Sequence, residues 1–311
     1  MSRSSLWLLI RENRLALAGL VVFCLFFLLA VAGYLLTAGS TPVLDPALVR
    51  LPERLLPPLS RPHPELLAPG ELPRLGIYLL GTDELGRDVL ARMLQGAWVS
   101  LTVGFVAVGI AVAIGVVYGG LAGYYGDRRL RLLPWLGISL DSLLMRFVDI
   151  MLCFPSFFLI LTVVAVLPAS IYNIMVVIGL TSWMGTALFV RAEFLSLREQ
   201  DFVTAVRALG LSDRRIIFRH MLPNALGPVL VSATIGIASA ILTEAGLSFL
   251  GFGVPPPHAT WGNILSDGKR FLFDAPWLTL IPGVAILIVV LAFNLFGEGL
   301  RDAINPKLRQ R

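Results

Sequence analysis

The sequence predicts an all-α, polytopic membrane protein with about six transmembrane helices. Of 311 residues, 57% are hydrophobic and only 14% are charged, and the mean hydropathy is +0.82, which is too apolar for a soluble domain of this length. The second observation is the presence of apolar runs that are long enough to cross a bilayer. The six predicted spans lie at about 15–36, 99–121, 143–167, 171–191, 225–250 and 277–296.

The distribution of basic residues predicts how these spans are oriented. Seventeen of the 25 lysines and arginines fall in segments on one side (residues 3–14, 128–146, 191–219 and 301–311), and basic residues mark cytoplasmic loops. Both termini are therefore predicted to be cytoplasmic. The predicted organisation is a cytoplasmic N-terminus with the first helix (1–36), an extracytoplasmic segment (37–98), a five-helix core (99–300) and a cytoplasmic tail (301–311).

The extracytoplasmic segment has two parts. Residues 41–73 are rich in proline and show no period, which predicts irregular structure. The end of the segment reads G-T-D-E-L-G-R-D-V from Gly81 to Val89, and Thr82 or Asp83 is predicted to cap a short helix leading into the second span. Such a helix either anchors the chain at the membrane surface or contacts a partner or the translocation path.

A polar stretch at 196–224 interrupts the apolar sequence and predicts two helices hinged at Gly210. Ser196 and Glu199 have the spacing of a capping box at the start of the first helix. Gly210 is a typical helix stop. Two capped helices between apolar spans predict a docking element on the cytoplasmic face. One side of the first helix carries Phe202, Ala205, Val206 and Leu209.

The second helix of this stretch has its own start and stop signals. Ser212 is predicted to cap it, with Asp213 in the first turn. Leu211 and Ile216 have the spacing of a hydrophobic staple. Pro223 is predicted to end the helix.

Ionisable and polar groups within the spans are candidate functional residues. Arg146 and Asp149 are three residues apart at the start of the third span, which favours a structural ion pair. Glu244 lies near the outer end of the fifth span, where a structural hydrogen-bonding role and a direct role in a transport path are equally supported. Asn294 at the inner end of the sixth span is expected to bond to a neighbouring helix.

Searches for catalytic chemistry find no motif. There is no G-x-x-x-x-G-K-[ST] phosphate loop, so the chain is not expected to bind ATP by itself. His63, His220 and His258 are scattered over loops on opposite sides, which argues against a metal site or a catalytic cluster. Ser248 has no histidine in any span to serve as a base. The positive charge of +5 is attributed to cytoplasmic loops next to lipid rather than to nucleic-acid binding.

The 196–224 stretch resembles the coupling motif of ABC importer permeases, which reads E-A-A, three residues, G, nine residues, I-x-L-P. The residues that match at the correct spacing are Ala205, Gly210, Leu222 and Pro223. The residues that depart from the motif are Thr204, Val206 and His220. The sequence from Arg207 to Asn224 is similar to that of the oligopeptide/dipeptide branch of the family.

The resemblance covers most of the chain and points to the second-permease (C-type) subunit of that branch. Its further motifs are matched at Gly81–Val89, at Asp149 with Pro155, at Glu244–Gly251, at Trp261–Gly262 and at Asn294–Asp302. The loop at 128–140 is longer than the family pattern, so no role is transferred to it.

The resemblance implies the type I ABC importer permease fold and a non-catalytic subunit in a prokaryotic plasma membrane. It implies four kinds of partner: a homologous second permease, two ATPase subunits that bind the ATP, an extracytoplasmic solute-binding protein, and membrane lipid. The coupling residues implied are Phe202, Thr204, Ala205, Val206, Arg207, Leu209, Gly210, Leu222 and Pro223. The expected substrates are dipeptides or oligopeptides, with nickel or glutathione as alternatives within the family. A secondary transporter is disfavoured because the chain shows no internal repeat.

Overall fold

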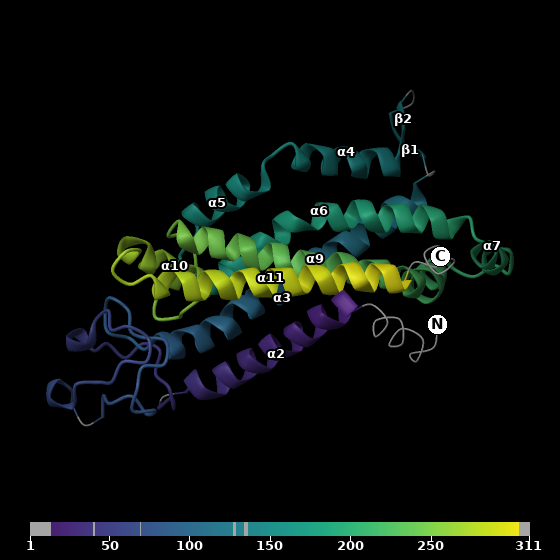
Figure 1. Cartoon of the computed structure of the whole chain (residues 1–311). Helices are drawn as coiled ribbons and strands as arrows, with labels where there is room; N and C mark the ends of the chain where they lie inside the picture. The colour runs from purple at the N-terminus through teal and green to yellow at the C-terminus, as the bar shows by residue number, and fades with distance from the viewer. Residues whose placement is uncertain (1–13, 40, 69, 127–128, 134–135, 305–311) are drawn as a thin grey trace.

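A computed structural model describes residues 14–304 apart from 40, 69, 127–128 and 134–135. Residues 1–13 and most of the C-terminal tail, which the sequence predicts to be cytoplasmic, thus lie outside the described residues. Figure 1 shows a bundle of long helices whose axes are roughly aligned. The helices are α2 (Arg14–Thr37), α3 (Val89–Tyr125), α4 (Leu140–Leu152), α5 (Ser156–Val166), α6 (Ile171–Arg198), α7 (Asp201–Ala208), α8 (Asp213–Arg215), α9 (Leu222–Phe249), α10 (Trp261–Gly268) and α11 (Trp277–Ile304).

Shorter elements complete the described chain. Three-residue 3-10 turns lie at Leu51–Glu53, Pro64–Leu66 and Lys269–Phe271, and a π-helical segment, η3, spans Ile216–Met221. Strands β1 (Arg129–Leu133) and β2 (Leu136–Ser139) form an antiparallel hairpin between α3 and α4. The hairpin accounts for the long loop at 128–140 and leaves the all-helical class unchanged.

Within the part of the chain that the structure describes, five helices are long and apolar enough to cross a membrane, and a sixth span results if α4 and α5 are counted together. This agrees with the predicted number. The third span differs from the single helix predicted at 143–167, because α4 and α5 meet at an angle of 78°. Pro155 lies at the break, where its ring disfavours a helical residue before it and its missing N–H prevents a continuous helix.

The bundle has two different ends (Figure 1). The start of α2 and the end of α11 lie near α7, and we call this end the α7 end. The segment of residues 38–88 and helix α10 lie at the opposite end, which we call the α10 end. The two ends carry the two candidate regions described below.

Small residues bring α3 and α6 into close contact at the centre of the bundle. Gly115, Gly119 and Gly123 are spaced four residues apart on α3 and face the backbone or Cβ atoms of α6. A Cβ atom at Gly115 would lie 2.6 Å from the Cβ of Thr186, and one at Gly123 would lie 2.6 Å from the Cβ of Phe194. This spacing allows helix backbones to approach closely in a membrane, where packing rather than hydrophobic burial drives association.

The start of α3 differs from the predicted one. Helix α3 begins at Val89, and its N-cap is Asp88, whose carboxylate accepts a hydrogen bond from the Leu90 N–H. The expectation that Thr82 or Asp83 caps a separate short helix was therefore wrong. Both residues lie in a tight turn before the helix, where their side chains bond to other parts of the 38–88 segment.

Candidate functional site

The first helix of the polar stretch begins later than its capping signal indicates. Ser196 lies inside α6, which continues to Arg198, and the N-cap of α7 is Gln200 without a side-chain cap bond. The predicted capping box of Ser196 and Glu199 was wrong because α6 extends beyond the apolar run that defined it. Helix α7 is instead held by Val203, which is fully buried in an apolar cluster that also contains residues of α3, α6, α9 and the segment 216–221.

The hinge at Gly210 is confirmed. Its φ of +75° lies in the left-handed region that favours glycine. The Gly210 N–H donates to Arg207 O at 3.0 Å and the Leu211 N–H donates to Val206 O at 3.3 Å, which is the hydrogen-bond pattern of a Schellman motif. No atom lies within 4 Å of a Cβ placed at Gly210, so the backbone conformation alone requires glycine there.

The second helix runs into the fifth span without a loop. Ser212 occupies the N-cap of α8, although its hydroxyl makes no cap bond, and Leu211 and Ile216 belong to one apolar cluster, as a staple requires. Segment η3 follows directly, and the Leu222 N–H bonds to Ile217 O five residues earlier. Pro223 is the second residue of α9 and lies within the continuous helical path that begins at Asp213. The prediction that Pro223 ends a helix was therefore wrong.

Side chains from α3 fix the hinge to the bundle. Tyr124 near the end of α3 donates its hydroxyl to the Asp213 carboxylate at 2.8 Å. The guanidinium of Arg207 lies 5.7 Å from the centre of the Tyr124 ring, within reach of a cation–π interaction. The two short helices are thus both anchored to the end of α3.

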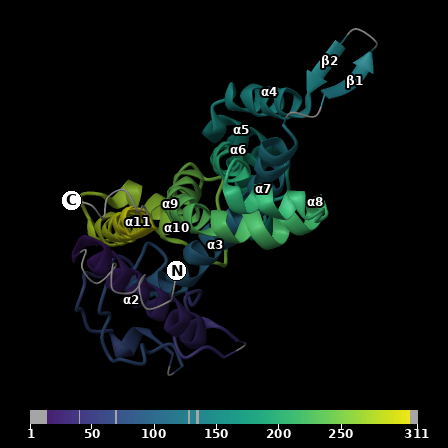
Figure 2. The same cartoon turned by 90° about the vertical axis from the view of Figure 1, so that its right-hand side faces the viewer.

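The outer side of these helices exposes apolar and basic groups together. Phe202, Leu209 and Phe218 expose 39%, 77% and 59% of their surface. Arg214 and Arg215 are exposed beside Phe218 and line a shallow cavity of about 370 Å³ with Ser212. We call this surface the α7–α8 face; Figure 2 views the molecule from this end. Large exposed apolar groups rimmed by charge are typical of protein interaction sites.

The remaining predicted coupling residues are divided between this face and the interior. Ala205 is exposed on α7, and Pro223 is exposed at the start of α9. Val206 and Leu222 are half-buried in the apolar cluster beneath the face. The Thr204 hydroxyl, at the position of the motif's glutamate, lies 3.3 Å from Gln200 O in its own helix.

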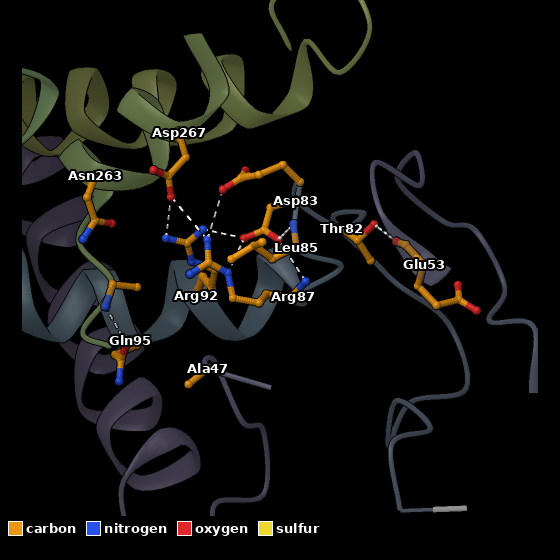
Figure 3. Close-up of polar contacts among 12 residues, drawn as sticks. Ala47, Glu53, Thr82, Asp83, Leu85, Arg87, Arg92, Gln95, Asn263 and Asp267 are labelled. Atoms are coloured by element: carbon orange, nitrogen blue, oxygen red, sulfur yellow. Dashed lines mark hydrogen bonds and ion pairs between the residues drawn. The ribbon is translucent and has the colours of Figure 1, made fainter. Parts of the chain in front are cut away.

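The α10 end contains a network of ion pairs that the sequence did not reveal (Figure 3). Asp83, which is fully buried, pairs with Arg87 at 2.7 Å and with Arg92 at 2.5 Å. Arg92 also pairs with Asp267 of α10 at 3.0 Å. The network joins the turn before α3 to α10, which lie about 180 residues apart in the chain. It replaces the surface helix expected at this place.

The turn before α3 also organises the 38–88 segment. The Thr82 hydroxyl donates to Glu53 O and accepts from the Leu56 N–H, so one side chain joins the 53–56 stretch to the turn before α3. Gly86 has a φ of +71°, and its missing Cβ leaves room for the Arg50 carbonyl. Burial is the main cause that raises the pKa of the Glu84 and Asp88 carboxyl groups, and Asp83 raises that of Glu84 further.

Glu244 lies between three hydroxyl-bearing elements in the interior of the bundle. The side chain is fully buried in α9 and accepts hydrogen bonds from Ser248 at 2.6 Å and from Ser100 of α3 at 3.2 Å. The Ser248 hydroxyl in turn lies 3.4 Å from that of Thr260, the N-cap of α10. The carboxyl group is thus well placed for a structural role, and its direct role in transport stays a prediction.

The other candidate residues of the spans are peripheral. Arg146 and Asp149 form an ion pair at 3.7 Å, but both side chains are largely exposed, so the pair adds little stability. Asn294 is exposed on α11. The part of the chain that the structure describes contains no group of three or more metal-ligating side chains.

Comparison with known proteins decides the family. Residues 135–310 match the family described as the inner membrane component of binding-protein-dependent transport systems. The chain belongs to this family. The dipeptide transport system permease protein DppC of Alkalihalophilus pseudofirmus is 39% identical over 96% of this chain and 88% of that protein. The oligopeptide permease OppC of Bacillus subtilis is 35% identical over 98% of this chain and 91% of that protein.

A solved structure supports the fold. The permease superposes on an inward-facing structure of the MetNI methionine ABC transporter with a TM-score of 0.50, over 68% of this chain and 95% of that one, at 20% identity. The fold is therefore that of ABC importer permeases. The permease is the non-catalytic, multi-pass membrane component of a bacterial importer, and it works with ATPase and binding-protein partners.

Proposed function

We propose that the permease forms half of the pore of an ATP-driven importer of dipeptides or oligopeptides and that the α7–α8 face is its ATPase docking site. The observation that supports docking most directly is the exposure of Leu209 and Phe218 beside Arg214 and Arg215. Apolar side chains of this size gain about 2 kcal/mol each on full burial in a partner groove. The arginines at the rim suit an acidic surface around that groove.

The route from this face into the membrane is continuous. Asp213 begins a helical path that continues through η3 and α9 to Phe249. Glu244 on this path lies roughly 45 Å from Asp213, at a rise of about 1.5 Å per residue. Displacement of the α7–α8 face by closure of the ATPase dimer would therefore move α9 as a body, and the pore would switch between inward- and outward-facing states.

The remaining partners follow from this arrangement. The α7 end is cytoplasmic, with both termini on the same side, and the α10 end faces the solute-binding protein. A homologous second permease completes the pore, and two ATPase subunits hold the ATP, so this chain binds no cofactor itself. The exclusion of charged side chains from α5 and most of α2 suits contact with lipid or with the second permease.

The docking role is tested by Leu209→Glu in the complete complex reconstituted in lipid. A buried carboxylate in the ATPase groove would prevent assembly, so we expect loss of ATPase association and of uptake. Phe273→Glu is the matched control, because Phe273 is 94% exposed and lies at the α10 end. Normal ATPase association in Leu209→Glu would contradict the docking site.

The substrate class rests on the relatives, which are permeases of dipeptide and oligopeptide transport systems. Uptake of labelled dipeptide by the reconstituted complex, dependent on ATP, tests it. Uptake of nickel or glutathione in place of peptide would support the alternative within the family. Uptake driven by an ion gradient without ATP would indicate a secondary transporter.

A further inference from the structure

A small cavity lies in the 38–88 segment, next to the start of α3 and outside the bundle. Its volume is about 290 Å³, close to the lower limit of small-ligand pockets. Residues 41–45, 70 and 72–74 form much of its wall, and Asp88 and Ala91 contribute the start of α3. The charged residues of the lining are Asp45, Arg50, Arg74 and Asp88.

Arg50 is held in this wall by its backbone and by its Nε atom. The Arg50 N–H donates to Leu85 O at 3.0 Å, which fixes the residue against the turn at Gly86. The Nε atom donates to Glu71 O at 2.5 Å, and the guanidinium lies 5.9 Å from the centre of the Tyr78 ring. The side chain is therefore positioned before any ligand arrives.

No carboxylate of the described residues forms an ion pair within 4 Å of Arg50, although the charge of Arg50 favours the ionised form of Asp88 in the same lining. Arg50 is only 6% exposed, and its Nη1 atom has no hydrogen-bond partner. A buried guanidinium N–H without an acceptor is costly, so Arg50 favours an external acceptor group. The two acidic residues of the lining already accept backbone hydrogen bonds, Asp45 from Ala47 and Asp88 from Leu90.

We propose that this cavity binds the carboxylate of a small ligand, such as the C-terminus of a free short peptide. The Nη1 atom of Arg50 has no partner, and a guanidinium N–H forms a strong, charge-assisted hydrogen bond to a carboxylate oxygen. Arg74, which is exposed at the rim of the cavity, supplies a second positive charge. The site is separate from the pore, and its existence does not depend on which solute the importer carries.

The test is binding of dialanine to the full-length permease in lipid nanodiscs, measured by calorimetry. Dialanine amide lacks the carboxylate, so we expect it to bind at least about tenfold more weakly, the effect of losing one charge-assisted hydrogen-bonded pair. Arg50→Gln and Arg74→Gln should each weaken dialanine binding. Because Arg74 is exposed, its variant is expected to fold even where Arg50→Gln does not.

Arg61→Gln is the matched control, since Arg61 is an exposed arginine of the same segment that does not line the cavity. It should bind dialanine as the unchanged permease does. Equal binding of dialanine and its amide, no binding of either, or unchanged binding in Arg74→Gln would each overturn the proposal. Dialanine binding that is insensitive to Arg74 but coupled to uptake would place the ligand in the pore and leave the transport function intact.

Discussion

The two ends of the permease are stabilised in different ways. At the α10 end, Asp83 and Arg92 are buried together and tie the 38–88 segment to α10. At the α7 end, two short helices are anchored mainly by Val203 and by the bond between Tyr124 and Asp213, while Leu209 remains exposed. A buried ion pair is stable only when both charges are present in good geometry. An exposed apolar surface has no such requirement and is typical of a site that is buried by a second protein.

This difference indicates a division of roles. The ion-pair network of Asp83, Arg87, Arg92 and Asp267 at the α10 end finds its partners within the chain and is suited to keep a fixed shape. The α7 end exposes large apolar groups, and under the proposed docking role it would transmit a movement. Substitutions at the two ends should therefore affect different quantities, and the following predictions use this to test the comparison.

The largest loss of stability is expected for Arg92→Met. Removal of this guanidinium leaves Asp83 with one cation instead of two and Asp267 without its closest partner. Breaking a buried pair typically costs about 3–5 kcal/mol, and Arg87 retains part of the compensation, so a loss near 3 kcal/mol is expected. Thermal unfolding of the detergent-solubilised permease measures it. Arg146→Gln, which breaks an exposed pair, serves as the control and should show no change.

Gly210→Val should affect coupling more than folding. Valine at a φ of +75° costs about 1–3 kcal/mol locally, and the hinge would change its conformation to avoid this strain. We expect normal insertion in the membrane but uptake that no longer follows ATP hydrolysis in the reconstituted complex. Gly210→Asn is the matched control, since asparagine tolerates the left-handed region better. Normal coupling in the valine variant would show that the hinge need not hold this conformation.

Tyr124→Phe removes the hydroxyl that bonds to Asp213 and keeps the ring beneath Arg207. The expected loss is about 1 kcal/mol, the net value of one hydrogen bond. Hydrogen exchange should report it as faster opening of the amides around α7 and α8, with unchanged protection at the α10 end. Equal changes at both ends would indicate that the ends are not independent.

The smallest effect concerns pH and the α10 end. Burial and the neighbouring Asp83 raise the pKa of Glu84 above its ordinary value. A raised carboxyl pKa contributes stability below the unfolded value of about 4.3, and this contribution is lost as the pH rises through the folded value. The stability of the unchanged permease relative to Glu84→Gln should therefore increase as the pH is lowered from 7. A difference that is flat with pH would show that Glu84 remains ionised as in water.

Much of the fold follows from the sequence because long apolar runs allow few structures in a bilayer. The hinge was also predictable, since only a glycine such as Gly210 adopts its φ without strain. Pro155 marks a possible bend in the sequence. The proline alone does not predict a break, because a helix can also continue through a proline with a kink. Gly115, Gly119 and Gly123 show a four-residue spacing that would have predicted the contact between α3 and α6.

The candidate sites were less predictable where distant segments meet. Asp83 and Asp267 are brought together by tertiary folding, and no local pattern links them. Ser196 was misleading because a polar residue near the end of a span resembles a cap when the helix simply continues. Val203 was missed because it lies about 100° around α7 from Phe202, outside the apolar side chosen from the sequence, and there it joins the buried cluster.

The unbroken passage from η3 into α9 determines how this permease can be recombined with its relatives. A chimera that exchanges α7 and α8 has a natural boundary between α6 and α7, near Gln200, where the chain is not helical. Pro223 offers no second boundary, since the backbone hydrogen bonds continue across it from Ile217 into the fifth span. A transplanted segment must therefore keep the five-residue hydrogen-bond register of η3, because a helix of ordinary register there would rotate every later residue of α9 within the bundle.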